Sequence, residues 1–188
     1  MMAPILFFLV FGIIEYGAAY GDKLGVSNSV TSGTRTASAG GSDGFADYQI
    51  LQSVIKSSSA MTKGSVQWIV VFKATGVDSV PTATCRAGTP SYGANPAATP
   101  PDYTGACNVY FPSDYATPKD SFGCNLALTL DKYWCPSTRK TSQTVLSGGP
   151  PDFIGVYMKA IHPYYTGFFG NAVTLTDQAI IQIEPRQL

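Results

Sequence analysis

Charged side chains are scarce in this 188-residue chain, and histidine is almost missing. Asp, Glu, Lys and Arg make up 13% of the residues, the formal net charge is zero, and the single histidine is His162. A chain without an excess of Lys and Arg creates no positive field that could hold the phosphates of a nucleic acid. We therefore expect no nucleic-acid partner.

The motifs of common enzyme classes are missing as well. The sequence contains no GxSxG, HExxH, GxxxxGK[ST] or GxGxxG pattern. His162 precedes Pro163 at the end of an apolar segment, where a surface or hydrogen-bonded structural role is usual. The aspartates are scattered in a way that is typical of helix caps and turns. The sequence thus predicts a non-enzymatic protein with no cofactor, no metal site and no small-molecule substrate.

The N-terminus, by contrast, is rich in apolar residues. Residues 3–20 read APILFFLVFGIIEYGAAY, with Glu15 as their one charged residue. Because a helix of this length nearly covers a hydrocarbon core of roughly 30 Å, we predict a transmembrane helix over residues 1–21. An ionised carboxylate inside a bilayer costs about 2.5 to 3.5 kcal/mol. Glu15 either reaches the membrane interface or faces another protein helix, protonated or paired.

Four cysteines occupy the middle of the chain without any CxxC pair. Zinc ligands usually come in closely spaced pairs, so two disulfides are the better interpretation, and they place this part of the chain in an oxidising compartment outside the cytoplasm. Spacing alone allows three pairings. We favour the pairing of sequence neighbours, Cys85 with Cys107 and Cys124 with Cys135.

The chain after the apolar segment divides into a stalk and a head. Residues 22–42 have poor helix propensity but can continue the first helix as a stalk or linker, ended by Gly40 and Gly41. Ser42 or Asp43 can then cap a second helix that reaches about residue 61, with an apolar stripe that should pack on a sheet. The head is expected over residues 43–188.

The strands of the head are predicted from β-branched and aromatic runs and from alternation of apolar and polar residues. The expected strands are Val66–Ala74, Phe153–His162 and Val173–Glu184, with a short additional one over Cys107–Phe111. The predicted fold class is α+β: an N-terminal transmembrane helix with a stalk, then a helix packed on a small antiparallel β-sheet with a disulfide-stapled loop region.

A cluster of aromatic residues joins the last two expected strands. Tyr164, Tyr165, Phe168 and Phe169 lie within a short stretch that also contains Gly167. The cluster predicts either an exposed adhesive or subunit-contact loop, or core packing between the two strands. The sequence does not decide between these two interpretations.

The apolar segment resembles a known family. Residues 4–17, PILFFLVFGIIEYG, are similar to the membrane segment of TadE-like minor pilins of the Tad (tight adherence, type IVc pilus) system, in which a proline, an apolar block and an ending of the form GIIE-aromatic-G recur. Residues 151–170 and 172–185 look like the later strands of that family. The cysteine region carries no motif of the family.

The resemblance implies a pseudopilin-like protein with its C-terminal domain outside the cytoplasm. A single N-terminal helix would anchor it in the cytoplasmic membrane and pack against other pilins and Tad assembly proteins, within or beneath a fibre. Glu15 matches the glutamate of the family's ending. The residues expected at this helix-packing surface are Pro4, Gly12, Glu15, Tyr16 and Gly17.

The chain departs from the family in one respect. TadE-like proteins usually have a prepilin peptidase site upstream of this segment, and we expect that some 10 to 20 residues carrying it precede Met1. The alternative is a secreted, disulfide-bonded binding domain whose signal peptide is cut after the small residues 17–19. The lack of a basic region before the apolar segment counts against this alternative.

Overall fold

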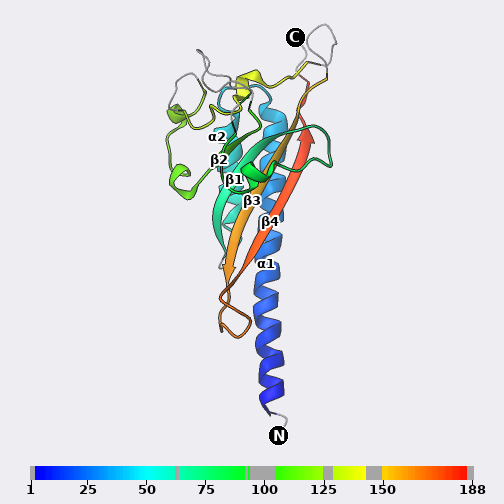
Figure 1. Ribbon diagram of the computed structural model, residues 1–188, viewed down its shortest axis with the longest axis vertical. Coiled ribbons are helices and arrows are strands. Elements are labelled where there is room, and N and C mark those ends of the chain that lie inside the picture. The colour runs from blue at the N-terminus through cyan, green and yellow to red at the C-terminus, as the bar shows by residue number, and fades with distance from the viewer. Residues whose placement is uncertain are drawn as a thin grey trace.

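The structure is a long helix whose second half is packed against a four-stranded sheet (Figure 1). This computed structural model describes residues 3–61, 64–91, 93, 105–124, 129–142 and 150–185, with side chains described from residue 6 onward. Helix α1 spans Ala3–Gly40 and helix α2 spans Ala46–Ser58. The N-terminus lies at the end of α1 that points away from the sheet. The predicted α+β class is confirmed.

Helix α1 is continuous through the predicted stalk, but residues 22–40 are not a free linker. Val26, Val30 and Ala37 are fully buried in the main core. Some hydroxyl groups of this half donate back to carbonyls four residues earlier, as Ser29 does to Gly25 at 2.7 Å, while Ser38 donates to the Gln182 carbonyl of the sheet at 2.9 Å. The expected stalk is therefore part of the packed domain, because one of its faces is made of small and apolar residues.

Helix α2 packs against α1 and, as expected, on the sheet, where its side chains share the main core with those of β1 and β3. Its buried residues Ile50, Leu51 and Val54 follow helical spacing. A Cβ atom at Gly33 of α1 would lie 2.5 Å from Val54 Cγ2, so the two helices approach closely only because residue 33 is glycine. Asp43 does not cap α2; it accepts a hydrogen bond from the Phe45 amide, at 2.8 Å, in the turn before it.

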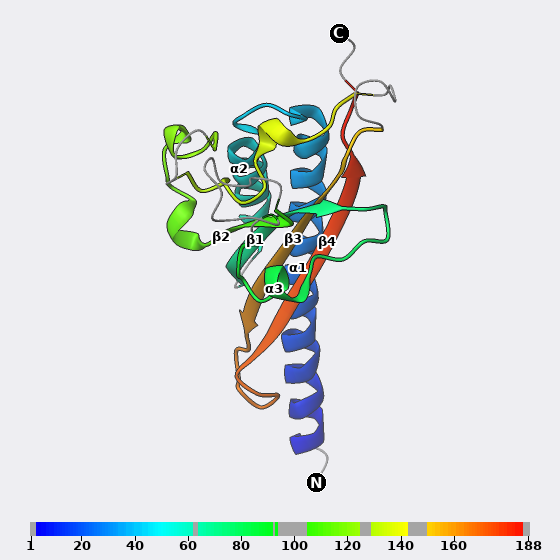
Figure 2. The same cartoon turned by 45° about the horizontal axis from the view of Figure 1, so that its top comes forward.

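The sheet is antiparallel, with the strand order β2-β1-β3-β4. Three strands lie within two residues of their predicted ends, and the short additional strand is present as well. Their bounds are Ser65–Ala74 for β1, Cys107–Tyr110 for β2, Phe153–Pro163 for β3 and Ala172–Gln182 for β4. The hairpin of β3 and β4 runs alongside α1 toward the N-terminus, as both Figure 1 and Figure 2 show.

Both faces of the sheet are covered. One face carries Ile69, Val71, Ile154, Val156, Met158 and Ala160, which form the main core with α1 and α2. The other carries Val70, Phe72, Ala74, Val109 and Tyr157, which pack against Cys85 and Cys107. Successive residues of a strand alternate between the two faces, and partners in register, such as Ile69 and Met158, share a face.

In its described residues, the cysteine region contains the short helix α3, Ala83–Arg86, and 3-10 turns at Pro112–Asp114, Lys119–Ser121 and Pro136–Thr138. The expected disulfide pairing is confirmed, with bridges from Cys85 to Cys107 and from Cys124 to Cys135. Trp134, next to the second bridge, is buried.

Candidate functional site

The carboxylate of Glu15 forms the centre of a junction between α1 and the loop that joins β3 to β4. Glu15 is fully buried although the helix around it is largely exposed. Its Oε2 accepts a hydrogen bond from the Tyr165 amide at 2.7 Å. Its Oε1 accepts one from the Thr166 hydroxyl at 2.7 Å and another from the Thr166 amide. Hydrogen bonds from N–H and O–H groups to a charged acceptor are stronger than those between neutral groups.

The sequence suggested the membrane interface or another protein helix as the surroundings of Glu15. In the single chain, its carboxylate is covered by the chain's own loop. Two features that are far apart in the sequence, the acidic residue in the apolar helix and the aromatic loop, form one site. Glu15 lies 150 residues from Tyr165 in sequence.

The aromatic side chains of the loop extend along α1 on both sides of Glu15. The Phe168 ring packs edge-on against Phe8, with centroids 5.4 Å apart. The Phe169 ring lies 5.5 Å from that of Tyr16, whose ring also faces Tyr164 at 6.5 Å. Phe168 nevertheless remains 62% exposed, so the loop is packed against α1 without being part of the core.

The two hollows beside the loop are apolar and shallow. Phe7, Phe8, Phe11 and Phe168 line one of about 250 Å³. The other, of about 390 Å³, lies between α1 and β4 and has Tyr20 and Leu175 among its lining residues. Neither contains a group of convergent polar side chains such as a catalytic site needs.

The residues predicted for helix packing lie in different surroundings. Gly12 faces Phe169, whose ring would lie 3.4 Å from a Cβ atom at that position. Tyr16 and Gly17 are exposed, and nothing lies within 4 Å of a Cβ atom at Gly17. The side chain of Pro4 lies outside the described residues.

A second buried pair joins α1 to the sheet about two turns of helix after Glu15. Asp22 and His162 are both fully buried, and His162 Nδ1 lies 2.6 Å from Asp22 Oδ2. His162 continues the alternation that places Ile154, Val156 and Met158 on the helix-facing side of β3. It is thus a hydrogen-bonded structural residue, which was one of the two roles expected for it.

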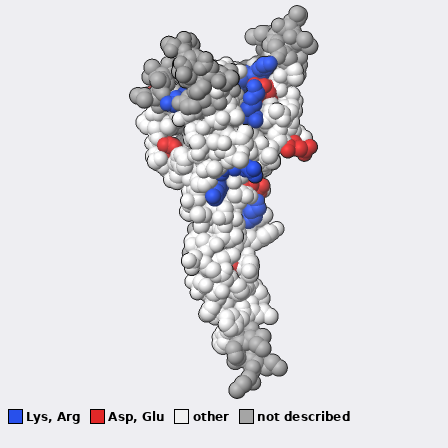
Figure 3. Space-filling model, in the orientation of Figure 1, with Lys and Arg blue, Asp and Glu red and all other residues white. Residues whose placement is uncertain are grey.

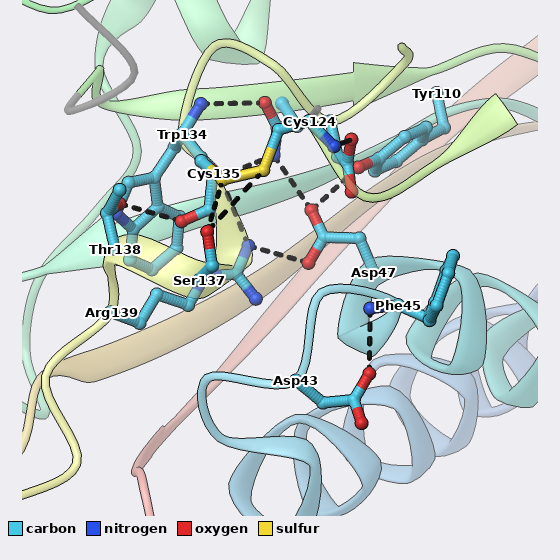
Figure 4. A network of polar contacts seen from close by, with 12 residues as sticks. Asp43, Phe45, Asp47, Tyr110, Cys124, Trp134, Cys135, Ser137, Thr138 and Arg139 are labelled. Carbon is cyan, nitrogen blue, oxygen red and sulfur yellow. Dashed lines mark hydrogen bonds and ion pairs between the residues drawn. A yellow bond between two sulfur atoms is a disulfide. The ribbon is translucent and has the colours of Figure 1, made fainter. Parts of the chain in front are cut away.

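The head contains a third buried polar group, shown in Figure 4. Asp47 of α2 is fully buried and lies 2.6 Å from Arg139 Nη2. Its Oδ2 accepts hydrogen bonds from the Tyr110 hydroxyl at 2.6 Å and from the Asn108 amide at 2.8 Å. Asn108 also exchanges two 2.9 Å hydrogen bonds with the backbone of Trp134. These contacts fix α2, β2 and the cysteine region to one another.

Asp131 forms the neighbouring part of this group. Its carboxylate accepts hydrogen bonds from the amides of Gly123, at 2.8 Å, and Cys124, at 3.0 Å. Burial, with the negative charge of Asp47 as a second cause, raises the pKa of Asp131 to about 6. Burial, again followed by the charge of Asp47, raises the pKa of Tyr110 well above its ordinary value.

The raised pKa of Asp131 predicts a pH dependence of stability. Between about pH 4 and pH 6 the unfolded chain releases this proton while the folded chain keeps it, so rising pH favours unfolding. The wild type should therefore lose about 2 kcal/mol, relative to an Asp131→Asn variant, between pH 4 and pH 7. Urea unfolding of both proteins at several pH values measures this difference. A difference that stays constant with pH would contradict the prediction.

The comparisons with known proteins add no assignment to this geometry. No protein-family model, curated protein or solved structure matches the chain. The fold and the site together define an α+β protein with two disulfides, in which two helices pack on a four-stranded antiparallel sheet. Among the residues that were described, no helix has both the length and the apolar character needed to cross a membrane.

Proposed function

We propose that this chain is a non-enzymatic minor pilin or pilus-assembly protein of a Tad-type pilus. In this role the N-terminal half of α1 is embedded in the cytoplasmic membrane, packs against the helices of other pilins and Tad assembly proteins, and carries the disulfide-bonded head outside the cytoplasm. The observation that carries the proposal is the contrast between the two halves of α1. The resemblance of residues 4–17 to the membrane segment of TadE-like proteins supports the same role.

The second half of α1 is packed against the rest of the chain, whereas most of the first half is exposed. In the second half, Val26 and Val30 are buried in the core. In the first half, large apolar side chains are exposed around the whole helix: Leu6, Phe7, Phe8, Leu9, Val10, Ile13 and Ile14. A helix that is apolar on all sides is normally surrounded by protein or lipid. This half therefore needs an apolar environment that its own head does not provide.

The contacts of Glu15 argue against removal of this half as a signal peptide. A cut after residues 17–19 would remove the acceptor of the Tyr165 and Thr166 amides, and with it Phe8, on whose ring Phe168 packs. The β3–β4 loop is thus shaped to lie against a helix that stays attached. The two disulfides favour an oxidising compartment for the head.

The proposal is tested in the native cells by placing a charge on the exposed half of α1. Ile13 is 66% exposed, so an Ile13→Lys variant should keep a folded head. We expect most of the variant to be lost from carbonate-washed membranes and from sheared pili, because a lysine near the middle of a membrane helix costs about 2.5 to 3.5 kcal/mol. Immunoblots of the two fractions measure the loss.

The matched control is Val80→Lys, which changes a 63% exposed residue of the head in the same way and should behave as the wild type. Recovery of the wild-type protein in the carbonate wash, together with normal pili in cells that lack it, would overturn the proposal.

A further inference from the structure

We infer that the loop between β3 and β4, residues 164–170, enters the lipid bilayer beside α1 and that Glu15 is the internal acceptor that makes this possible. The inference rests on the proposed membrane anchoring of α1 and adds a second membrane-embedded element. The apolar surface of the loop is covered by the lipid acyl chains of the leaflet next to the head.

The first argument is the distribution of charge. Residues 163–176 contain no Asp, Glu, Lys, Arg or His, and Glu15 is the one charged residue among residues 3–21. Because Glu15 is fully buried, the exposed part of this region presents no charge. On the face drawn in Figure 3, the described atoms of the lower stem are white apart from one small red spot, while Lys, Arg, Asp and Glu gather above it.

The second argument is that backbone amides of the loop find hydrogen-bond acceptors within the protein. A non-helical backbone is tolerated at membrane depth only where its polar groups find partners in the protein. The amides of Tyr165 and Thr166 donate to Glu15, the Tyr164 amide donates to the Asn171 carbonyl at 3.1 Å, and the Gly170 amide donates to the Gly167 carbonyl at 3.3 Å. Glu15 thus satisfies two amides at the tip that would otherwise need water.

The third argument is that the exposed side chains form layers that match those of a bilayer. Lys23 lies nearest the head, where its partly exposed ammonium group is paired with Asp177 at 2.8 Å. The exposed Tyr20 and Tyr16 follow along α1, and tyrosine is enriched at membrane interfaces. Phe8 and Phe168 lie furthest out, about 12 Å of helix beyond Tyr16. From the head outward, a lysine is followed along α1 by two tyrosines and then by phenylalanines. Lipid phosphates, the membrane interface and the acyl chains follow one another in the same order.

A helix of a second copy could cover the same apolar surface. Such a helix would not require the graded order of side chains along α1, nor an aromatic loop that stays exposed after packing. Lipid accounts for both features, and the second copy is treated as an outcome of the test.

The test uses tryptophan as a depth probe in the full-length protein. Phe168→Trp places the probe at the loop, Phe7→Trp places it on the anchor helix, and Val77→Trp places it on an equally exposed site of the head. Each variant is reconstituted in phosphatidylcholine vesicles, with and without lipids brominated on their acyl chains. The emission of the wild type, which comes from Trp68 and Trp134, is subtracted. We expect the brominated chains to quench most of the emission added at residues 168 and 7, and none of that added at residue 77.

The three probes separate this inference from the proposed function. Quenching at residue 7 without quenching at residue 168 would overturn the loop insertion and leave the anchor intact. Absence of quenching at both would overturn the membrane anchor as well. An unquenched residue 168 in a protein that cross-links as a dimer would replace lipid by a second copy as the occupant.

The role of Glu15 is tested in the Phe168→Trp background. In Glu15→Gln the side chain keeps one acceptor oxygen in place of two, so the loop should detach from α1 and the quenching at residue 168 should fall. Glu184→Gln, which changes an exposed glutamate of the head in the same way, should leave the quenching unchanged. Equal quenching in both glutamine variants would overturn the role assigned to Glu15.

Discussion

Replacement of Asp47 by alanine is expected to lower the free energy of unfolding by about 3 to 5 kcal/mol, the usual cost of leaving a buried charge without its partner. The side chain of Arg139 has no exposed surface, and in the described part of the chain its Nε and Nη1 have no hydrogen-bond partner. Without Asp47, its charge would keep the Trp134 ring, 4.2 Å away, and a 3.4 Å hydrogen bond to the Trp134 carbonyl. The Tyr110 hydroxyl and the Asn108 amide would lose their acceptor too.

Urea unfolding of the full chain, in detergent and without reductant, measures this loss.

Three further variants define the origin of the loss in stability. Arg139→Met should cost less than Asp47→Ala, because Asp47 keeps two hydrogen-bond donors. Asp47→Leu combined with Arg139→Met should recover much of the loss, since buried ion pairs can often be replaced by apolar residues. Asp120→Ala, at an exposed site, should change stability by less than about 0.5 kcal/mol. A loss below about 1 kcal/mol for Asp47→Ala would contradict an uncompensated buried charge.

The strands and the second helix could be predicted because their signals are local. Alternation of apolar residues identified β1, β3 and β4, and the spacing of Ile50, Leu51 and Val54 identified α2. Residues 22–40 continue helix α1, as expected, but their low helix propensity and small residues gave no sign that one of their faces packs in the core. In the fold, small residues such as Gly33 are what allows α2 to lie close to α1.

The polar junctions could not be predicted in the same way, because each joins residues far apart in sequence. Asp47 lies on the buried stripe of α2, three residues before Ile50, which is a signal that a charged residue faces the core. His162 lies on the buried side of β3 by the same reasoning. Neither pattern names a partner, since Arg139 and Asp22 are brought there by the tertiary fold. For Glu15, its position in an apolar helix indicated a special role, and the loop that fulfils it became evident only in three dimensions.

Removal of the disulfide between Cys85 and Cys107 is expected to lower the free energy of unfolding by about 3 kcal/mol. This bridge closes a loop with a sequence separation of 22, and both of its cysteines are fully buried in the cluster behind the sheet. A double variant with alanine at both positions removes the constraint on the unfolded chain without leaving a buried thiol. Urea unfolding without reductant compares it with the wild type.

The bridge between Cys124 and Cys135 provides the matched comparison, because its sequence separation is 11. If loop-closure entropy governs both bridges, its removal by the corresponding alanine pair should cost about 0.6 kcal/mol less. The second bridge also holds the Cys124 amide against Asp131, so a larger cost there than at the first bridge would mean that native contacts, and not the unfolded chain, determine its contribution. A cost below about 1 kcal/mol for the first bridge would show that it adds little to a sheet already held by α1, since native bridges in small domains typically contribute 2 to 5 kcal/mol.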